Sequence, residues 1–327
     1  MSLVWRILRY AALFLAGVLL IVITTLAVSF FSGRHTLEFN GSIRSYHLYI
    51  PTSYDASQPV PLVLMFHMRS GFGWLMQEIS NFNAVAESGG FIVVYPDGVG
   101  NSWADGRGIS AADQAGVDDV AFTAALIDHL SEQYAIDLGR VYAAGFSNGG
   151  MLALRLACEL PDRITAVAAV SSSMPQSVQA ACHPGRAIPV LMMNGTADDV
   201  IPLNGKTGLV SVSEALLTWV DIGGCDPVPV VDDIDPADDG TVVRFEIFRD
   251  CQDEIRIWHY VINDGGHRWP GSASFWQFVL SGRMTRDIDA SAEIWSFFQS
   301  YTLEPAYPQA RTTEPFSQWG SGIEATG

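Results

Sequence analysis

The sequence predicts an α/β fold built on a mostly parallel central sheet. Short runs that are apolar at every position recur along the chain, and segments with apolar residues at three- and four-residue steps lie between them. Strands of a parallel sheet are covered on both faces by the helices that connect them, so their residues are apolar at every position. Alternation of such strands with helices predicts one α/β domain over residues 36–302.

The first 34 residues form a separate segment. Arg6 and Arg9 precede an uncharged apolar stretch over residues 11–31, which Arg34 closes. As a helix this stretch is about 30 Å long, the thickness of the hydrocarbon core of a bilayer. We therefore predict a membrane anchor at residues 1–34 that leaves the following domain outside the cytoplasm. The alternative is a cleaved signal peptide, and both interpretations export the domain.

Strands are predicted at seven places. Residues 43–50 alternate in polarity, which is typical of a strand with one buried face, and residues 255–262 form the last strand. The other five are continuous apolar runs typical of central strands. They are residues 61–67, 91–95, 141–144, 166–170 and 188–193.

Helices are predicted between and after these strands. Residues 120–134 have helical apolar spacing, and either Asp118 or Asp119 is placed to cap the helix. Ser211 and Glu214 form a capping-box pattern at the start of another helix. Residues 294–301 predict a closing helix.

Two segments depart from this alternation. Residues 226–240 are rich in proline and aspartate, and we interpret them as a solvated connection. A calcium loop that begins at Asp233 needs glutamate at its twelfth position, where Arg244 stands, so metal binding is the less favoured alternative. Residues 303–327 have little apolar periodicity and are predicted to be disordered.

Charge and cysteine content limit the classes of partner and the compartment. The 327 residues carry a formal net charge of −17 and Lys206 is the one lysine, so nucleic-acid phosphates would be repelled. The cysteines are Cys158, Cys182, Cys225 and Cys251, and none is in a C-x-x-C pattern. Three pairings are possible. We favour the local one, Cys158 with Cys182 and Cys225 with Cys251, over four free thiols.

A G-x-S-x-G motif runs from Gly145 to Gly149, directly after a predicted strand and before helical spacing. In that context the motif predicts a nucleophile elbow, in which Ser147 takes a strained turn. The flanking positions must be small because strand and helix pass closely there. The backbone N–H of Asn148 is then placed to bind an oxyanion. The alternative is a glycine-rich turn with an incidental serine.

A serine nucleophile needs an orienting acid and a base, in the chain order Ser, Asp, His for this architecture. Asp198 follows the strand at residues 188–193 and is the preferred acid, with Asp199 as the alternative. His267 lies in a glycine-rich loop after the last strand and is the predicted base. His67 is expected to shape the oxyanion loop.

Five stretches resemble one known family. They are PDGVGNSWADGRG, VDDVAF, RVYAAGFSNGGMLALRLAC, NGTADDVIP and GGHRWPG. In order and spacing they are similar to the polyhydroxybutyrate depolymerase and feruloyl esterase group of α/β-hydrolases, also called carbohydrate esterase family one, over about residues 36–301. The resemblance implies an α/β-hydrolase fold and hydrolysis of carboxylic esters without metal or organic cofactor. It also implies Ser147 as nucleophile, Asp198 as acid and His267 as base.

The chain departs from the family pattern after its first core strand. The family usually has His-Gly there, whereas this chain has His67-Met68. Met68 is the candidate for the second oxyanion N–H, but a left-handed backbone is costly for methionine. Either the loop uses Gly71 or Gly73 instead, or the oxyanion hole is weakened.

Aromatic residues near these motifs suggest an apolar cleft for a hydroxyacyl or aromatic acyl group. The candidate substrate-binding residues are Trp74, Trp103 and Trp269. Core packing is the alternative for each of them.

The sequence thus predicts an exported serine esterase, membrane-anchored or secreted, that acts on soluble esters or oligomers. The alternatives are a serine peptidase of the same fold and a non-catalytic binding protein on a hydrolase scaffold.

Overall fold

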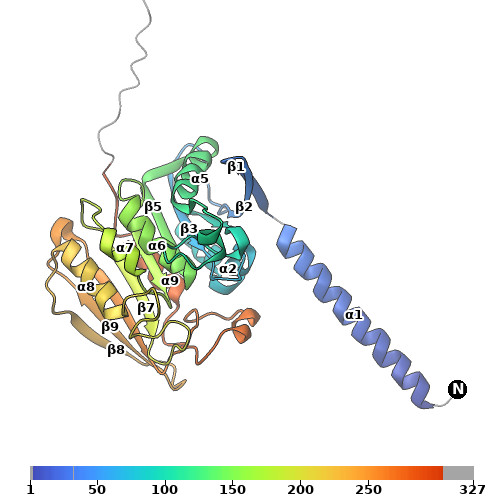
Figure 1. Cartoon of the computed structure of the whole chain (residues 1–327). Coiled ribbons are helices and arrows are strands. Elements are labelled where there is room, and N and C mark those ends of the chain that lie inside the picture. The colour runs from blue at the N-terminus through green and yellow to red at the C-terminus, as the bar shows by residue number, and fades with distance from the viewer. Residues whose placement is uncertain (1–2, 32, 305–327) are drawn as a thin grey trace, which may run out of the picture.

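The computed structural model describes residues 3–31 and 33–304. The strands are β1 (Arg34–Phe39), β2 (Ser42–Tyr49), β3 (Val60–Phe66), β4 (Ile92–Pro96), β5 (Ile136–Phe146), β6 (Ala166–Val170), β7 (Val190–Gly195), β8 (Val230–Ile234), β9 (Val242–Phe248) and β10 (Ile257–Asn263). They form one ten-stranded sheet in the order β1-β2-β4-β3-β5-β6-β7-β10-β9-β8 (Figure 1).

The sheet is parallel in its centre and antiparallel at both edges. Each neighbouring pair from β4 through β3, β5, β6 and β7 to β10 is parallel. The pairs β1–β2, β2–β4, β10–β9 and β9–β8 are antiparallel. The mostly parallel sheet expected from the continuous apolar runs is therefore confirmed, because those runs are the central strands.

Helices lie along both faces of this sheet (Figure 1). The α-helices are α1 (Leu3–Phe31), α2 (Gly73–Ser80), α3 (Phe82–Gly89), α4 (Ala111–Gln114), α5 (Asp119–Gln133), α6 (Asn148–Glu159), α7 (Gln176–Ala181), α8 (Val212–Gly223) and α9 (Ala290–Phe298). Short 3-10 turns occur at Val99–Asn101, Gln252–Glu254 and Phe275–Val279.

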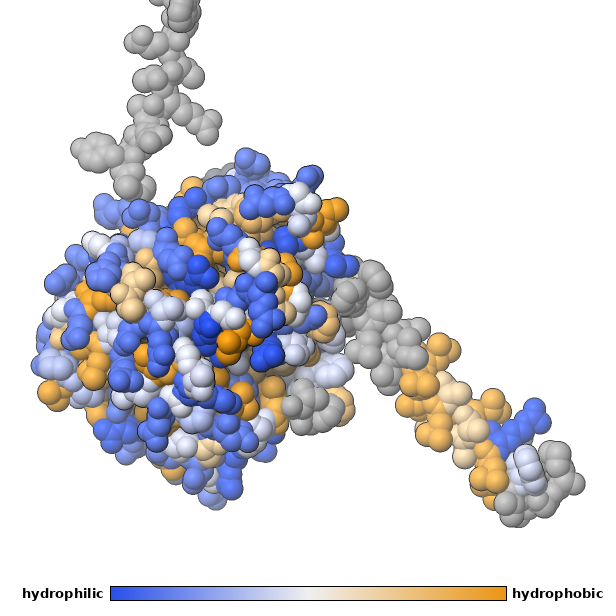
Figure 2. Space-filling view, viewed as in Figure 1, coloured by the Kyte–Doolittle hydropathy of each residue, from blue (hydrophilic) through white to orange (hydrophobic). Residues whose placement is uncertain are grey.

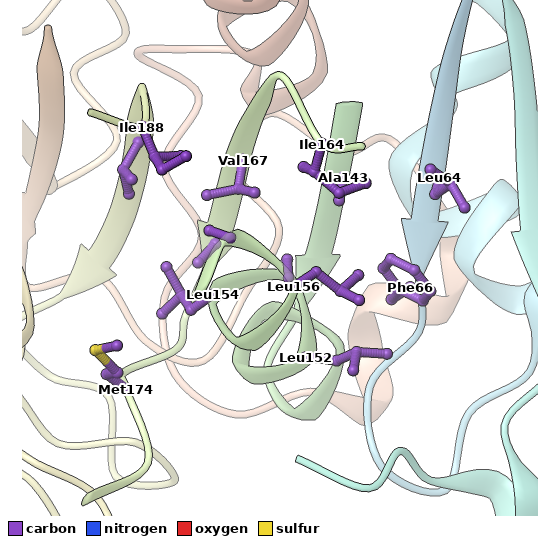
Figure 3. Packing of buried hydrophobic residues seen from close by; sticks show 14 of the residues in the cluster. Leu64, Phe66, Ala143, Leu152, Leu154, Leu156, Ile164, Val167, Met174 and Ile188 are labelled. Atoms are coloured by element: carbon purple, nitrogen blue, oxygen red, sulfur yellow. The ribbon is translucent and has the colours of Figure 1, made fainter. Parts of the chain in front are cut away.

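The sheet separates two apolar cores, and β3 contributes alternately to each. Leu64 and Phe66 pack with residues of α5, α6 and α8 on one face, and Figure 3 shows Phe66 beside Leu152 and Leu156 of α6. Met65, between them in the chain, packs with residues of α2, α3 and α9 on the other face. Side chains of a strand alternate between faces, so burial of both faces requires apolar residues at every position.

Two helix starts follow the predicted capping chemistry. The Asp118 side chain accepts a hydrogen bond from the N–H of Ala121, so Asp118 rather than Asp119 caps α5. Ser211 and Glu214 form a complete capping box at the start of α8. Both caps satisfy backbone donors that the first helical turn leaves without partners.

The segment 226–240 is not only a connection, because it contains the strand β8. This strand pairs with β9 at the edge of the sheet. Val230 and Val231 are exposed there, at 42% and 41%. Because backbone hydrogen bonds rather than burial hold β8 in place, its side chains carry little of the periodicity that marks a strand in sequence.

Helix α1 precedes β1 and projects away from the sheet domain (Figure 1). The described part of the helix has an apolar surface (Figure 2), on which Tyr10 and Phe14 are each 71% exposed. Within the described residues, no helix meets the length and apolarity required to cross a bilayer. The described residues therefore do not support the predicted membrane span over residues 11–31.

The chain end and the disulfides complete the domain. Leu303 donates its backbone N–H to the carbonyl of Gly139, whereas residues 305–327, most of the predicted disordered tail, lie outside the described residues.

The structure contains the two sequence-local disulfides, Cys158–Cys182 and Cys225–Cys251. The favoured pairing is thus confirmed. Bridges that span 24 and 26 residues can each contribute about 3 kcal/mol to stability.

Candidate active site

Ser147 occupies a sharp turn between the end of β5 and the start of α6. Its φ of 55° and ψ of −117° lie in a region that L-residues rarely adopt. Such a backbone costs about 1–3 kcal/mol and persists where surrounding contacts impose it. Here the Ser147 N–H donates to the Val170 carbonyl, and the Ser172 hydroxyl donates to the Ser147 carbonyl. The Ser147 hydroxyl makes no capping hydrogen bond to α6.

The glycines of the motif allow three backbones to meet at this turn. A methyl group on Gly145 would collide with the backbone of Gly149, because strand and helix pass in direct contact. A methyl group on Gly149 would collide with the carbonyl oxygens of Phe66 and His67. The start of α6 therefore lies directly against the end of β3, which brings Asn148 close to the loop that contains Met68.

His267 and Asp198 form a buried pair beyond the carboxyl ends of the parallel strands, where Ser147 also lies. The distance between His267 Nδ1 and Asp198 Oδ2 is 2.8 Å, although the two residues are 69 positions apart. Asp198 Oδ1 accepts hydrogen bonds from the backbone N–H groups of Val200 and Ile201. These bonds hold the carboxylate so that its other oxygen faces the imidazole.

Asp199 has a different environment from its neighbour. Its Oδ1 accepts a hydrogen bond from the Ser281 hydroxyl, and this bond lowers the pKa of the exposed Asp199 carboxyl. Between the two candidate acids, Asp198 is therefore the one in contact with His267.

The imidazole of His267 lies beside the turn that contains Ser147. Its ring centroid is 4.9 Å from that of Phe146, the residue that precedes Ser147. The Ser171 hydroxyl, in the loop after β6, donates to the carbonyl of Arg268 and ties the two loops together. The structure thus brings the loops that carry Ser147, Asp198 and His267 together at the carboxyl ends of β5, β7 and β10.

The loop after β3 offers few free backbone donors. Among residues 70–73, Gly71 donates its N–H to the Met68 carbonyl and Gly73 donates to Asp97 Oδ1, while Ser70 donates to the Asn101 carbonyl. Neither glycine proposed as an alternative oxyanion donor is therefore available. Met68 remains the candidate of this loop.

The strain expected at Met68 does not occur. The residue with positive φ in this loop is Ser70, at 61°, and Met68 is not among the described residues with positive φ. The left-handed backbone therefore lies at Ser70, two residues after the position where the family has glycine. Met68 keeps an ordinary backbone.

His67 is a structural residue with a defined tautomer. Its Nδ1 donates to the Met68 carbonyl at 2.7 Å, and its Nε2 accepts from the Gly98 N–H at 2.9 Å. Both ring nitrogens are thus engaged in a buried, neutral imidazole, so His67 cannot act as the base. His67 thus ties the loop after β3 to Gly98, and its part in shaping an oxyanion hole stays a prediction.

The titration of His67 predicts an acid-sensitive contribution to stability. Burial lowers the pKa of His67 to about 4, against about 6.5 for an exposed histidine. Below pH 6.5 His67 is protonated in the unfolded chain but stays neutral in the folded chain. The contribution of His67 to the free energy of unfolding is therefore fully present above pH 6.5 and is lost as the pH falls toward 4. Between pH 7 and 4.5 this amounts to about 2 kcal/mol.

The matched variant is His67→Gln, whose amide can donate to Met68 and accept from Gly98 without titrating. Urea unfolding at pH 7 and pH 4.5 should show wild type losing about 2 kcal/mol more than the variant between the two conditions. Equal losses in the two proteins would show that His67 does not titrate in this way.

The three candidate substrate tryptophans have different environments. Trp103 and Trp269 are 0% and 1% exposed, so a substrate cannot touch them in this structure. The Trp103 Nε1 donates to the His67 carbonyl, and the Trp269 Nε1 donates to the Ser291 hydroxyl. Their predicted substrate contacts are therefore corrected to core positions, which indole rings with satisfied N–H groups can occupy.

Trp74 is partly exposed and belongs to an aromatic cluster. Its ring stacks on Phe72 with centroids 6.2 Å apart and meets Trp276 edge to face at 5.8 Å. The cluster joins α2, which follows the loop after β3, to the 3-10 turn Phe275–Val279, which follows His267.

Some of the residues that build the site carry no catalytic signature in sequence. The main examples are Asp97, which accepts a hydrogen bond from the Gly73 N–H beside the loop after β3, and Asp105, which accepts one from Asn148 at the start of α6. The one signal that includes them is the stretch PDGVGNSWADGRG. Within the described residues, no group of three or more His, Cys, Asp and Glu could hold a metal ion.

Comparison with known proteins adds independent findings. Residues 76–221 match the Phospholipase/Carboxylesterase family model. The chain is 30% identical over 237 residues to feruloyl esterase C of Emericella nidulans, which covers 70% of this chain and 77% of that relative.

Two further likenesses are more distant. Feruloyl esterase B of Piromyces equi is 26% identical over 70% of this chain, and the match spans 43% of that relative's length. Among solved structures, acetyl xylan esterase from Aspergillus awamori aligns with a TM-score of 0.55 and 17% identity, over 72% of this chain and 94% of that chain. At this identity the structural likeness shows a shared fold.

Proposed function

The chain belongs to the feruloyl esterase group of α/β-hydrolases, and we propose that it cleaves carboxylic esters through a covalent acyl-enzyme on Ser147. The observation that carries the proposal is the 2.8 Å contact between His267 and Asp198, beside a serine held at positive φ. A buried acid, an imidazole and an elbow serine at one sheet edge are the parts that nucleophilic acyl transfer requires.

In the first half of the reaction, His267 Nε2 removes the proton from Ser147 Oγ as the oxygen attacks the ester carbonyl carbon. The N–H groups of Met68 and Asn148 bind the oxyanion that forms on the carbonyl oxygen. Asp198 accepts the Nδ1–H and stabilises the imidazolium. The C–O bond to the leaving alkoxide then breaks, and His267 returns its proton to that oxygen.

In the second half, water replaces the alcohol. His267 removes a proton from the water, whose oxygen attacks the acyl carbon through the same oxyanion hole. The bond to Ser147 Oγ breaks, the serine regains its proton from His267, and the carboxylic acid leaves. The N-terminal end of α6 adds a favourable dipole to the oxyanion site.

We further propose that Trp74 contacts the acyl part of the substrate. The partly exposed cluster of Phe72, Trp74 and Trp276 offers flat apolar surface beside the segment that carries Met68. Aromatic rings stack well on such a surface, whereas an acetyl group has little area to bury. Feruloyl and similar aromatic esters are therefore the favoured substrates, and acetyl and hydroxybutyrate esters are the comparison classes.

Replacing Trp74 with alanine tests this placement. We expect KM for a feruloyl ester to rise about tenfold, since the lost stacking surface is worth about 1.4 kcal/mol. KM for an acetyl ester should change less than about twofold, because its small acyl group does not reach the ring. Steady-state kinetics on both esters decide the matter, and an equal rise for the two would place Trp74 away from the acyl group.

The ester assignment itself is tested with a panel of substrates. The purified domain should hydrolyse feruloyl, acetyl or hydroxybutyrate esters and leave a matched feruloyl anilide intact. Faster cleavage of the anilide would favour the serine peptidase alternative. A folded domain that cleaves neither class would favour the non-catalytic binding protein.

We also propose that the domain works outside the cytoplasm. Two disulfides support this, because such bridges persist in oxidising compartments. The uncharged stretch at residues 11–31 supports export through residues 1–34, either as an anchor or as a cleaved signal. Fractionation of cells that express the full chain, followed by mass measurement of the product, separates the two outcomes. An intact chain in the cytosolic fraction would contradict both.

A further inference from the structure

Residues 97–107, the segment that follows β4, bind the loop that contains Met68. The Gly98 N–H donates to His67 Nε2 at 2.9 Å. The Trp103 Nε1–H donates to the His67 carbonyl at 2.9 Å. The residue before Met68 is thus held through both its side chain and its carbonyl, which sets the direction of the peptide that carries the Met68 N–H.

The same segment also binds Asn148, which carries the other proposed oxyanion donor. The Trp103 N–H donates to Asn148 Oδ1 at 2.8 Å, and Asn148 Nδ2 donates to the Trp103 carbonyl at 3.2 Å. Asn148 Nδ2 also donates to Asp105 Oδ2 at 2.6 Å. The side chain of Asn148 therefore has partners on both its oxygen and its nitrogen, all from residues 103–105.

One internal ion pair stiffens the segment, and two neighbouring helices hold it in place. Arg107 Nη2 lies 2.7 Å from Asp105 Oδ2 and compensates the buried charge of that carboxylate. Ala104 donates its N–H to Asp119 of α5 and accepts a hydrogen bond from Arg155 of α6. A segment held at this many points has little freedom to shift during a reaction.

We infer that residues 97–107 form a brace that sets the positions of the two oxyanion donors, the N–H groups of Met68 and Asn148. Trp103 and Asp105 are its positioning residues. Both side chains are 0% exposed, so they act through His67 and Asn148 and do not touch the substrate. This inference rests on the proposed esterase mechanism and adds the residues that keep its oxyanion hole in shape.

The brace matters because oxyanion donors work at short range. Each N–H must lie about 2.7–3.1 Å from the oxygen of the transition state, and loss of one donor costs about 10²–10³ in rate. A displacement of about 1 Å can cost as much as 10²-fold. Asn148 begins α6 and is held there by its side-chain hydrogen bonds to Trp103 and Asp105, and the loop with Met68 leaves β3 as irregular backbone that depends on outside contacts.

The test uses Trp103→Phe, which removes the indole N–H and keeps a buried aromatic ring. Asp105→Asn is the second variant, because it weakens the bond to Asn148 Nδ2 with little change of shape. Trp219→Phe is the matched control. Trp219 is also 0% exposed, and its Nε1 has no hydrogen-bond partner among the described residues.

For each brace variant we expect kcat on a feruloyl ester to fall about tenfold or more while KM stays within about twofold. The inhibition constant of a trifluoromethyl ketone should weaken by the same factor, because its hemiketal oxygen occupies the oxyanion hole. Trp219→Phe should retain wild-type values for both quantities.

The outcomes separate this inference from the proposed function. An active wild type whose kcat and ketone inhibition are unchanged in both brace variants would overturn the brace alone, even if their melting temperatures fall. A wild type that neither hydrolyses esters nor binds the ketone would overturn the esterase mechanism and the brace together. Equal losses in Trp219→Phe would also overturn the brace, since any buried tryptophan would then have the same effect.

Discussion

Replacement of Ser147 with alanine should abolish ester hydrolysis, with kcat falling about 10⁵–10⁶-fold. The residual rate reflects substrate binding and the oxyanion hole without a nucleophile. Labelling by a fluorophosphonate, which reacts with an activated serine hydroxyl, should disappear at the same time. The fold should be preserved because alanine has a Cβ like serine and the Ser147 hydroxyl caps no helix.

Ser173→Ala is the control for this experiment. Ser173 lies in the loop after β6 and is also buried, but its hydroxyl donates to the carbonyl of Val210. This variant should retain labelling and activity. Labelling that persists in Ser147→Ala would place the nucleophile elsewhere, and a wild type that takes no label would favour the non-catalytic alternative.

Replacement of Asp198 with asparagine should lower kcat about 10⁴-fold. Its Oδ1 could still accept from the N–H groups of Val200 and Ile201, as the carboxylate does. The amide NH₂ would then face His267 Nδ1 and require that nitrogen to be an acceptor. The proton of the neutral imidazole would move to Nε2, which could no longer take the proton of Ser147.

Asp199→Asn is the matched control, because it makes the same chemical change one residue along the chain. Asp199 bonds to Ser281, not to the imidazole, so its variant should keep activity within about twofold. Steady-state kinetics and fluorophosphonate labelling rates on the two variants give the comparison. A large loss in Asp199→Asn with a small one in Asp198→Asn would reverse the assignment.

Features encoded over a few residues were predictable. The elbow at Ser147 is such a feature, because the turn leaves no room for a Cβ at the glycines on either side of it. The capping box of Ser211 and Glu214 is another, because both partners lie within one helical turn. The central strands belong to this group as well, since burial of both faces requires apolar residues throughout.

Features that depend on a distant partner were not predictable. The sequence favoured Asp198 but kept Asp199 as an alternative, and only the structure shows which of the two contacts His267, 69 residues away from Asp198. Edge strand β8 escaped detection because its side chains face solvent. The burial of Trp103 depends on its packing against the end of β3 and the start of α6, which aromatic character near a motif does not reveal.

The loop after β3 shows the same division. The sequence alone identified the departure from His-Gly at Met68, but only the tertiary structure decided its consequence, because the positive φ lies at Ser70 and both nearby glycines donate elsewhere. The sequence by itself determined the fold class, the elbow serine and the sets of candidate acids and oxyanion donors. These depend on local steric limits and on burial, which act on each residue separately. The tertiary structure decided which candidates meet, because sheet order sets the distances between loops far apart in the chain.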